Sequence, residues 1–458
     1  MRSHEWVEQN EERFVSWRRE FHRVPEVGWT EFVTTAKIVE KLEGTGFLLH
    51  VGADAIAADE RLGVPDQEEL DEAMLRAKEY GVPTALLDKM KNGTTGVVAR
   101  LDTGRTGAHT VLRFDIDGLP ITEATDDNHL PFKESFQSTI AGNMHACGHD
   151  GHTAIGLAVA HYISHHQDEL VGTFTLLFQP AEEGSRGAKT MAAKGWLTGA
   201  DYFLSGHIGI QDREIGQIAA TTTGFLATTK FDLTFTGKAA HAGAYPETGK
   251  NAMVAASAFV QNALAIPRHS DGTTRINIGT LRSGSGRNVI PDRAALQGET
   301  RGQTDKLDTY MFDEVQRVAK AAALMSNVKA NIEVVGHGMT ARCDDVWVNR
   351  LTAATEANPF VDTIIPTLPI GASEDAAVLM TDVQNEGGEA TYMIFGTPLA
   401  AGHHHPSFDY DERVLSVGVA TYIDLISHYM NSVTRTAKFF FAVHFFLIKN
   451  GKLEQSNK

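Results

Sequence analysis

The chain has 458 residues, which is more than one hydrophobic core usually supports, so two domains are expected. Its net charge of −17 argues against nucleic acid and against an anionic membrane as partners, and requires a site for an anionic substrate to carry its own arginines. Two cysteines allow one disulfide at most, and the amphipathic N-terminus has no apolar signal segment, so a cytoplasmic location is expected.

Helices and strands alternate through the first half of the chain. Helical spacing of apolar residues precedes Pro25, and a second helix is expected to end near Gly44. Strands are expected at 94–102, 108–120, 172–184 and 202–210, with a buried helix at 153–166. The charged segment 65–81 is predicted to be a helical insertion, because Asp66 and Glu69 have capping-box spacing. This order predicts an α/β fold with its chemistry at strand ends.

The pattern changes near Gly224 to that of a small α+β unit. Its expected elements alternate as β-α-β-β-α-β, the order of a ferredoxin-like fold, over 228–238, 251–266, 274–284, 294–302, 307–325 and 328–336. We therefore predict a domain inserted at 225–337 into a larger one formed by 1–224 and 338–458. The apolar run 439–448 is too short to cross a bilayer, for which about 20 residues are needed.

The stretch "MHACGHDGH" contains the first candidate metal ligands. Cys147 and His149 are separated by one residue before a helix, so both side chains could face one point. A thiolate and an imidazole suit a divalent ion such as zinc. The alternative is a buried structural cysteine beside surface histidines.

Two adjacent glutamates, Glu182 and Glu183, follow an apolar strand in "FQPAEEG". Two buried carboxylates repel each other and need a cation nearby. A metal meets this need if one glutamate binds it and the other takes a proton from water. The alternative is a solvated pair in a loop.

Further histidines stand at strand and loop positions. His207 ends the apolar strand at 202–210, where a core histidine with a polar partner is equally consistent with the sequence. His403, His404 and His405 form a run in a glycine–proline loop, and such runs also bind metals adventitiously. Taken together, the sulfur, the imidazoles and the paired carboxylates favour a two-metal hydrolase.

The chain resembles a family of metal-dependent amidohydrolases that includes aminoacylases, auxin-conjugate hydrolases and glutamate carboxypeptidase. The resemblance extends over nearly the whole chain up to about Ala437, and its motifs are "RFDIDGLP", "MHACGHDGHTA", "LLFQPAEEG", "GKAAHAG", "GRNVIPD" and "HHHPSFDYDE". Within the family, "GSRGAKTMAAKG" and the charged insertion are most similar to hydrolases of p-aminobenzoyl-glutamate. The fold that the resemblance implies is a zinc-peptidase-like α/β catalytic domain with a central mixed sheet, plus an inserted ferredoxin-like α+β domain for dimerisation or as a lid.

The resemblance also implies the roles of individual residues. Two divalent ions, manganese or zinc, would be bound by Cys147, His149, Glu183, His207 and His404. Glu182 would be the general base, and Asp117 would orient a metal ligand. Among the three tandem histidines, His404 matches the family ligand by its position two residues before the proline.

In the inserted domain, His241 and Asn288 match family residues that hydrogen-bond the substrate. Arg301 matches an arginine that binds the carboxylate of the amino-acid half. Without the family, these would be a turn histidine, a loop asparagine and a surface arginine. The family architecture implies a homodimer through the inserted domain, in which His241 enters the neighbouring site.

The expected reaction is hydrolysis of the amide bond of a small-molecule N-acyl amino acid, with p-aminobenzoyl-glutamate as the first candidate. An aminoacylase or hippurate-type deacylase would share every catalytic residue and differ in its acyl pocket. The sequence is also consistent with a binding protein on the same fold, and with a subunit that works only in a heteromer with a homologous chain.

Overall fold

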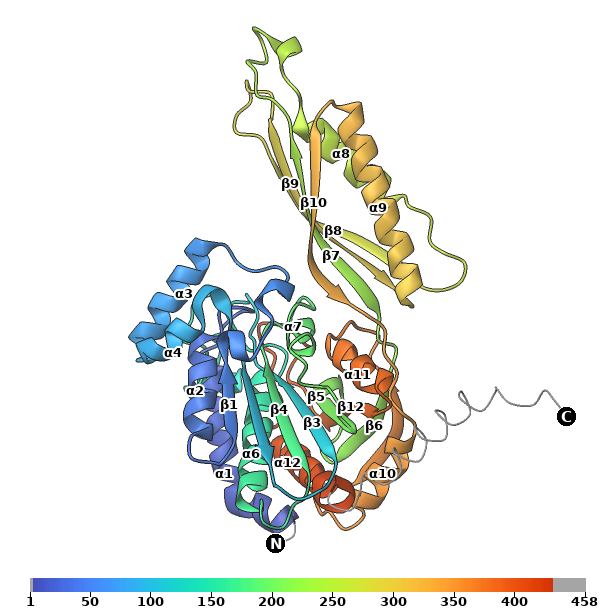
Figure 1. The fold of residues 1–458 in the computed structure, drawn as a ribbon. Coiled ribbons are helices and arrows are strands. Elements are labelled where there is room, and N and C mark those ends of the chain that lie inside the picture. The colour runs from blue at the N-terminus through green and yellow to red at the C-terminus, as the bar shows by residue number, and fades with distance from the viewer. Residues whose placement is uncertain (1–2, 431–458) are drawn as a thin grey trace, which may run out of the picture.

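The computed structural model describes residues 3–430, and its larger part is built on an eight-stranded sheet (Figure 1). The strand order is β1-β2-β4-β3-β5-β12-β6-β11. The strands are β1 (Leu48–Val51), β2 (Val97–Asp102), β3 (His109–Asp115), β4 (Thr173–Gln179), β5 (Tyr202–Asp212), β6 (Gln217–Thr223), β11 (Thr363–Pro369) and β12 (Glu389–Thr397). Both parallel and antiparallel pairs occur, which confirms the predicted mixed sheet.

The centre of this sheet places the chemistry-bearing loops together. Strand β3 pairs in parallel with β4 on one side and β5 on the other. The carboxyl ends of parallel strands meet at one edge of a sheet, so the segments that leave β3 and β4 must be neighbours. All seven residues of β3 are buried, as expected for a strand covered on both faces.

Helices cover both faces of the large sheet, and each face has its own apolar core. Helices α1, α2, α6 and α12 pack against one another on one face, while α7 and α11 pack together on the other. The helices outside the inserted segment are α1 (Ser3–His22), α2 (Phe32–Leu42), α3 (Gln67–Glu79), α4 (Thr84–Lys89), α5 (Leu130–Lys133), α6 (His149–His165), α7 (Ala188–Ala192), α10 (Val346–Thr355), α11 (Ala376–Asn385) and α12 (Arg413–Leu425).

A separate four-stranded antiparallel sheet stands beyond the large one and is connected to it through β7 and β10 (Figure 1). Its elements follow the predicted ferredoxin-like order: β7 (Ala227–Thr236), α8 (Ala252–Leu264), β8 (Thr274–Ser283), β9 (Arg293–Gly302), α9 (Asp305–Met325) and β10 (Lys329–Gly338). The spatial order β10-β7-β9-β8 leaves β8 at an edge. The exact boundaries of the inserted domain, 225 and 337, stay a prediction.

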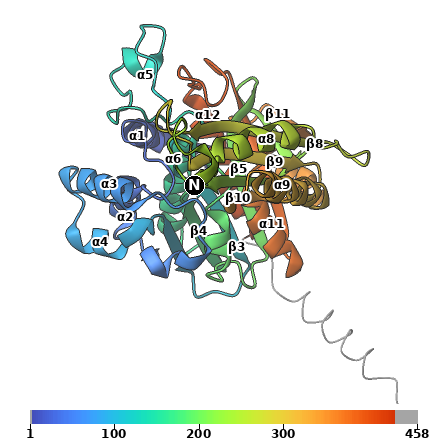
Figure 2. The same ribbon diagram turned by 90° about the horizontal axis from the view of Figure 1, so that it is seen from above.

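The charged insertion forms helix α3, as predicted, with α4 directly after it. The Asp66 side chain accepts a hydrogen bond from the backbone N–H of Glu69, which is the expected cap. Seen from above, α3 and α4 lie at the side of the molecule away from α9 (Figure 2).

A buried polar network fixes helix α1 to the start of α6. The guanidinium of Arg18 lies 2.9 Å from the carboxylate of Asp150 and 2.6 Å from that of Asp409. The His22 imidazole bonds Asp150 at 2.8 Å through Nδ1 and Glu123 at 3.0 Å through Nε2. Because Asp150 follows His149, this network holds the helix turn that carries a candidate metal ligand.

The network predicts a pH dependence of stability. Burial by itself lowers the pKa of His22, but hydrogen bonds to Asp150 and Glu123 outweigh it and raise the pKa from 6.5 to about 9. Because the folded protein holds this proton more tightly than the unfolded chain, protonated His22 stabilises the fold. The stabilisation is complete below pH 6.5, the pKa in the unfolded chain, and is lost as the pH rises through about 9. We expect the free energy of unfolding to fall by up to about 3 kcal/mol across this window relative to His22→Gln. Urea unfolding of both proteins at several pH values measures this difference in the free energy of unfolding.

The exposed His165 offers a matched control, since His165→Gln should keep the wild-type pH slope. An identical slope in wild type and His22→Gln would contradict this account of the network.

Within residues 3–430, no helix is both long and apolar enough to cross a bilayer. Cys147 and Cys343 are both free, so the one possible disulfide does not form. The apolar run 439–448 lies outside the described residues.

Candidate metal and catalytic site

Cys147 and His149 project from the tight turn that opens α6. Gly148 between them has φ of 93°, a left-handed conformation that glycine adopts without strain. Nδ1 of His149 lies 2.9 Å from the backbone carbonyl oxygen of Asp117, and a carbonyl only accepts, so Nδ1 carries the proton. Nε2 of His149 is buried and has no hydrogen-bond partner, so its lone pair is available to a ligand.

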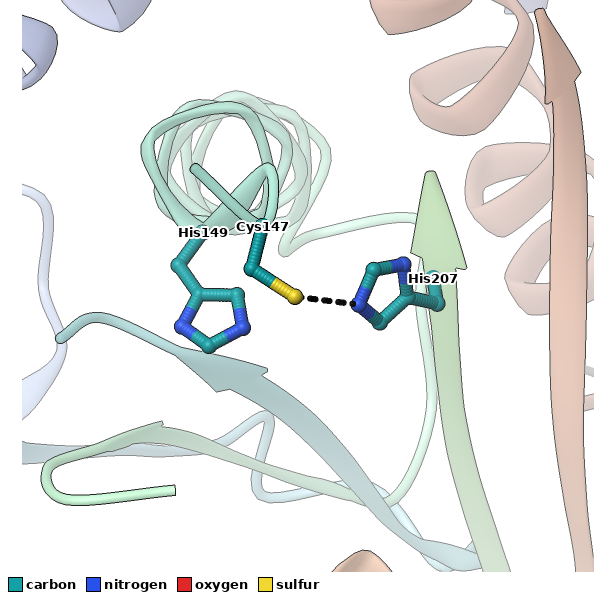
Figure 3. Close-up of side chains that lie close together, drawn as sticks. All are labelled: Cys147, His149 and His207. Atoms are coloured by element: carbon teal, nitrogen blue, oxygen red, sulfur yellow. Dashed lines mark hydrogen bonds between the residues drawn. The ribbon is translucent and has the colours of Figure 1, made fainter. Parts of the chain in front are cut away.

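His207 reaches the same place from strand β5, and Figure 3 shows its ring facing the sulfur of Cys147. Nε2 of His207 lies 3.5 Å from Sγ of Cys147. Nδ1 lies 2.8 Å from the carbonyl oxygen of Ile208, which fixes the proton on Nδ1. Burial and the neighbouring His152 lower the pKa of His207 well below its usual range. A neutral imidazole with a free Nε2 is the form that binds metals.

Glu182 and Glu183 lie in the turn after β4, and Asp117 holds that turn. Its two carboxylate oxygens accept hydrogen bonds from the backbone N–H groups of Glu182, at 3.1 Å, and Glu183, at 3.0 Å. Its Oδ1 also lies 3.3 Å from Nδ1 of His149. Ala181 just before the pair has φ of 52°, a strained conformation for a residue with a side chain. Asp117 therefore positions both glutamates and His149 together.

Only one of the three tandem histidines joins the ligand cluster. Nε2 of His404 lies 3.3 Å from Oε1 of Glu183, and its backbone N–H donates to the carbonyl of Ala146 at 2.8 Å. His403 instead donates from Nε2 to the carbonyl of Gly209, at 2.5 Å. Nδ1 of His405 accepts a local hydrogen bond from the Ser407 backbone. The geometry thus favours His404, in agreement with the register of the family motif.

The five residues expected to bind metal form two overlapping clusters with Cys147 in both. One contains Cys147, His149 and His207, and the other contains Cys147, Glu183 and His404. In each cluster the potential ligand atoms lie within 4.8 Å of one another. Sulfur, imidazole and carboxylate are suitable ligands for zinc-like ions, and Nε2 of His149 lacks a hydrogen bond. The residues therefore fit divalent cations, and Cys147 is common to both clusters.

The electrostatics separate the two adjacent glutamates. Burial, with the carboxylates of Glu374 and Glu183, raises the pKa of Glu182 well above its ordinary value. Burial opposes ionisation of Glu183 as well, but the hydrogen-bonding His404 lowers the pKa of Glu183. Glu182 is thus suited to hold a proton, and Glu183 is suited to stay ionised. Two neighbouring carboxyl groups with different pKa values are typical of sites that carry out acid–base chemistry.

These groups line a cavity of about 370 Å³. Arg301 and Lys230, from β9 and β7 of the small sheet, form part of its wall together with the residues from the large sheet. The cavity therefore lies between the two sheets, and the small sheet supplies positive charge to it.

Comparisons with known proteins agree with this geometry. The pattern of peptidase family M20/M25/M40 matches residues 111–428. The chain belongs to this family. It is 44% identical to indole-3-acetyl-aspartic acid hydrolase of Enterobacter agglomerans, over 91% of this chain and 96% of the relative. It is 42% identical to a p-aminobenzoyl-glutamate hydrolase subunit of Escherichia coli K12, over 88% and 93%. The crystal structure of an aminobenzoyl-glutamate utilization protein from Klebsiella pneumoniae matches at 37% identity and a TM-score of 0.79, covering 94% and 99%.

Membership of family M20/M25/M40 confirms the predicted metallohydrolase acting on amide bonds. It also confirms the fold that the resemblance implied.

Sequence reasoning missed several side chains of this M20 site. Arg113, fully buried on β3, forms ion pairs with Asp115 at 2.7 Å, Glu374 at 3.0 Å and Asp375 at 2.9 Å. Tyr392 donates to Glu374 at 2.5 Å. Glu374 and Asp375 come within 4.8 Å of Glu182. The signal that could have found them is the acidic pair in "GASEDAAV", directly before the apolar face of α11.

Two predicted substrate-binding residues of this M20 chain lie away from the cavity. His241 and Asn288 are exposed neighbours in the loops that follow β7 and β8, where the N–H of Ala242 donates to the carbonyl of Asn288. Neither lines the site cavity, whereas Arg301 does. Within one chain, the structure brings together the metal-ligand candidates, Glu182, Asp117 and Arg301, but not His241 or Asn288.

Proposed function

We propose that this chain hydrolyses the amide bond of N-acyl amino acids, with p-aminobenzoyl-glutamate cleaved to p-aminobenzoate and glutamate as the leading substrate. The observation that carries the proposal is the convergence of Cys147 with both ligand clusters beside Glu182. Relatives at 42–44% identity, whose names specify N-acyl aspartate and N-acyl glutamate hydrolysis, support the substrate class.

The ligands of two divalent cations are Cys147, His149, Glu183, His207 and His404 in this proposal. Cations held there would supply the positive charge that makes a water molecule more acidic and a carbonyl carbon more electrophilic. A thiolate favours zinc, whereas carboxylates and imidazoles also accept manganese.

Glu182 is the proton carrier of the proposed reaction. It takes a proton from the attacking water as the oxygen bonds to the acyl carbon. It then gives the proton to the amino-acid nitrogen as the amide C–N bond breaks, which releases a carboxylate and an amine. The position of Glu182 in the cavity wall beside Cys147 and Glu183 supports this role.

Positive groups on the small sheet orient the substrate. Arg301 lines the cavity and would bind the carboxylate of the amino-acid half, with Lys230 beside it. His241 and Asn288 would act on the acyl carbonyl and the substrate carboxylate from a second copy of the chain. This arrangement makes a dimer, through the small sheet and its helices, a requirement for activity.

The proposal is tested with the purified chain alone, chelated and then reloaded with manganese or zinc. We expect p-aminobenzoyl-glutamate to be hydrolysed much faster than hippurate. Preferential cleavage of hippurate would assign the chain to the aminoacylase type. Activity that appears only after a homologous chain is added would make it one subunit of a heteromer.

A further inference from the structure

A second cavity adjoins the site and is unusually rich in arginine. It has a volume of about 550 Å³ and lies along strands β8 and β9 at the end of the small sheet nearer the large one. Its charged lining consists of Arg268, Arg275, Arg301 and Glu299. Three arginines and one glutamate leave two positive charges in excess, in a chain whose net charge is −17.

The arginines oppose one another directly across the strands. Arg275 of β8 pairs with Arg301 of β9 in the sheet register, so both side chains stand on the same face. Like charges directly opposite each other in a sheet are destabilising. Such an arrangement needs an anion nearby to offset the repulsion.

The protein supplies that anion to only one of the pair. Glu299 binds Arg301, with Nε to Oε1 at 2.9 Å and Nη2 to Oε2 at 3.2 Å. Within residues 3–430, neither Arg268 nor Arg275 forms an ion pair with a carboxylate. The guanidinium of Arg268 only donates to the backbone carbonyl of Ile266, at 2.8 Å. Two cations therefore face the cavity without a counter-ion from this part of the chain.

One side chain is shared by this cavity and the catalytic site. Arg301 lines both this cavity and the one that contains Cys147 and Glu182. Directly opposite residues in adjacent strands have Cβ atoms about 4.5–5.5 Å apart. Two arginines that stand side by side on one sheet face are suited to two carboxylates joined by a short carbon chain.

We propose that Arg275, with Arg268, forms a subsite for the side-chain carboxylate of an acidic amino acid whose α-carboxylate is bound by Arg301. This inference rests on the proposed N-acyl amino acid hydrolysis and narrows it to substrates with a dicarboxylic amino-acid half. Arg275 is thus a specificity-determining residue, and the repulsion between Arg275 and Arg301 is relieved when the dianionic half binds.

The test compares p-aminobenzoyl-glutamate with p-aminobenzoyl-glutamine, which has the same shape but a neutral side chain. We expect kcat/KM of the wild type to favour the glutamate substrate by about ten- to a hundredfold, the effect of one charge-assisted contact. Arg275→Gln should bring the ratio near one, by raising KM for the glutamate substrate and leaving the glutamine substrate unchanged. Arg282→Gln is the matched control, because Arg282 lies on the same strand and face but lines neither cavity.

The outcomes distinguish the two proposals. If the metal-loaded wild type cleaves neither compound, the proposed function fails and the subsite fails with it. If both are cleaved without preference, or if the preference survives in Arg275→Gln, only the subsite is overturned. A change in molar mass of Arg275→Gln by light scattering, with selectivity unchanged, would likewise reject the subsite, because Arg275 would then serve contact between copies of the chain.

Discussion

Replacing Glu182 with glutamine is expected to lower kcat by about a thousandfold or more while the protein keeps its metal and its substrate affinity. Glutamine has the same shape but cannot accept the proton of the attacking water. The turn should persist, because Asp117 holds it through the backbone N–H groups of Glu182 and Glu183. Steady-state kinetics, metal content by mass spectrometry and calorimetric substrate binding give the three readouts.

Glu356→Gln provides the control, since Glu356 is exposed just after α10 and should retain wild-type rates. Loss of metal from Glu182→Gln would make Glu182 a ligand rather than the base. A rate within about tenfold of the wild type would remove Glu182 from the acid–base role.

Mixing two inactive variants is expected to restore activity if each site borrows His241 from a second copy of the chain. His241→Ala should be nearly inactive, although its exposed loop lies outside the cavity of its own chain. In a dimer of His241→Ala with Glu182→Gln, one of the two sites is complete. Random pairing after co-expression therefore predicts about one quarter of the wild-type activity.

The control pair places one defect in each of the two sites of the mixed dimer, so that neither site is complete. Glu182→Gln co-expressed with His207→Ala should stay inactive, because both residues act on the site of their own chain. Full activity of His241→Ala alone, or no recovery in the mixed dimers, would contradict the shared site.

The sequence could predict the parts of the site that local patterns encode. Cys147 and His149 are one residue apart, and Glu182 and Glu183 are adjacent, so each pair is visible in its own motif. The β-α-β-β-α-β order was readable because apolar periodicity distinguishes strands from helices. The choice of His404 depended on the register of the family motif, since three tandem histidines look alike without their partners.

What the sequence could not predict depends on pairing between distant segments. In the sequence, Arg113 is only one polar residue within an apolar strand. Its ion-pair partners Glu374 and Asp375 lie more than 250 positions away, so no local pattern reveals them. The opposition of Arg275 and Arg301 exists only in the β8–β9 register, which no local pattern specifies. The remoteness of His241 from its own cavity is likewise a consequence of tertiary structure.

Anomalous X-ray diffraction from crystals grown with manganese or zinc tests the central claim most directly. We predict two metal peaks, both within bonding distance of Sγ of Cys147, about 2.3 Å for zinc, and together contacting His149, Glu183, His207 and His404. Peaks that avoid Cys147, or no peak among these side chains in the metal-loaded protein, would contradict it.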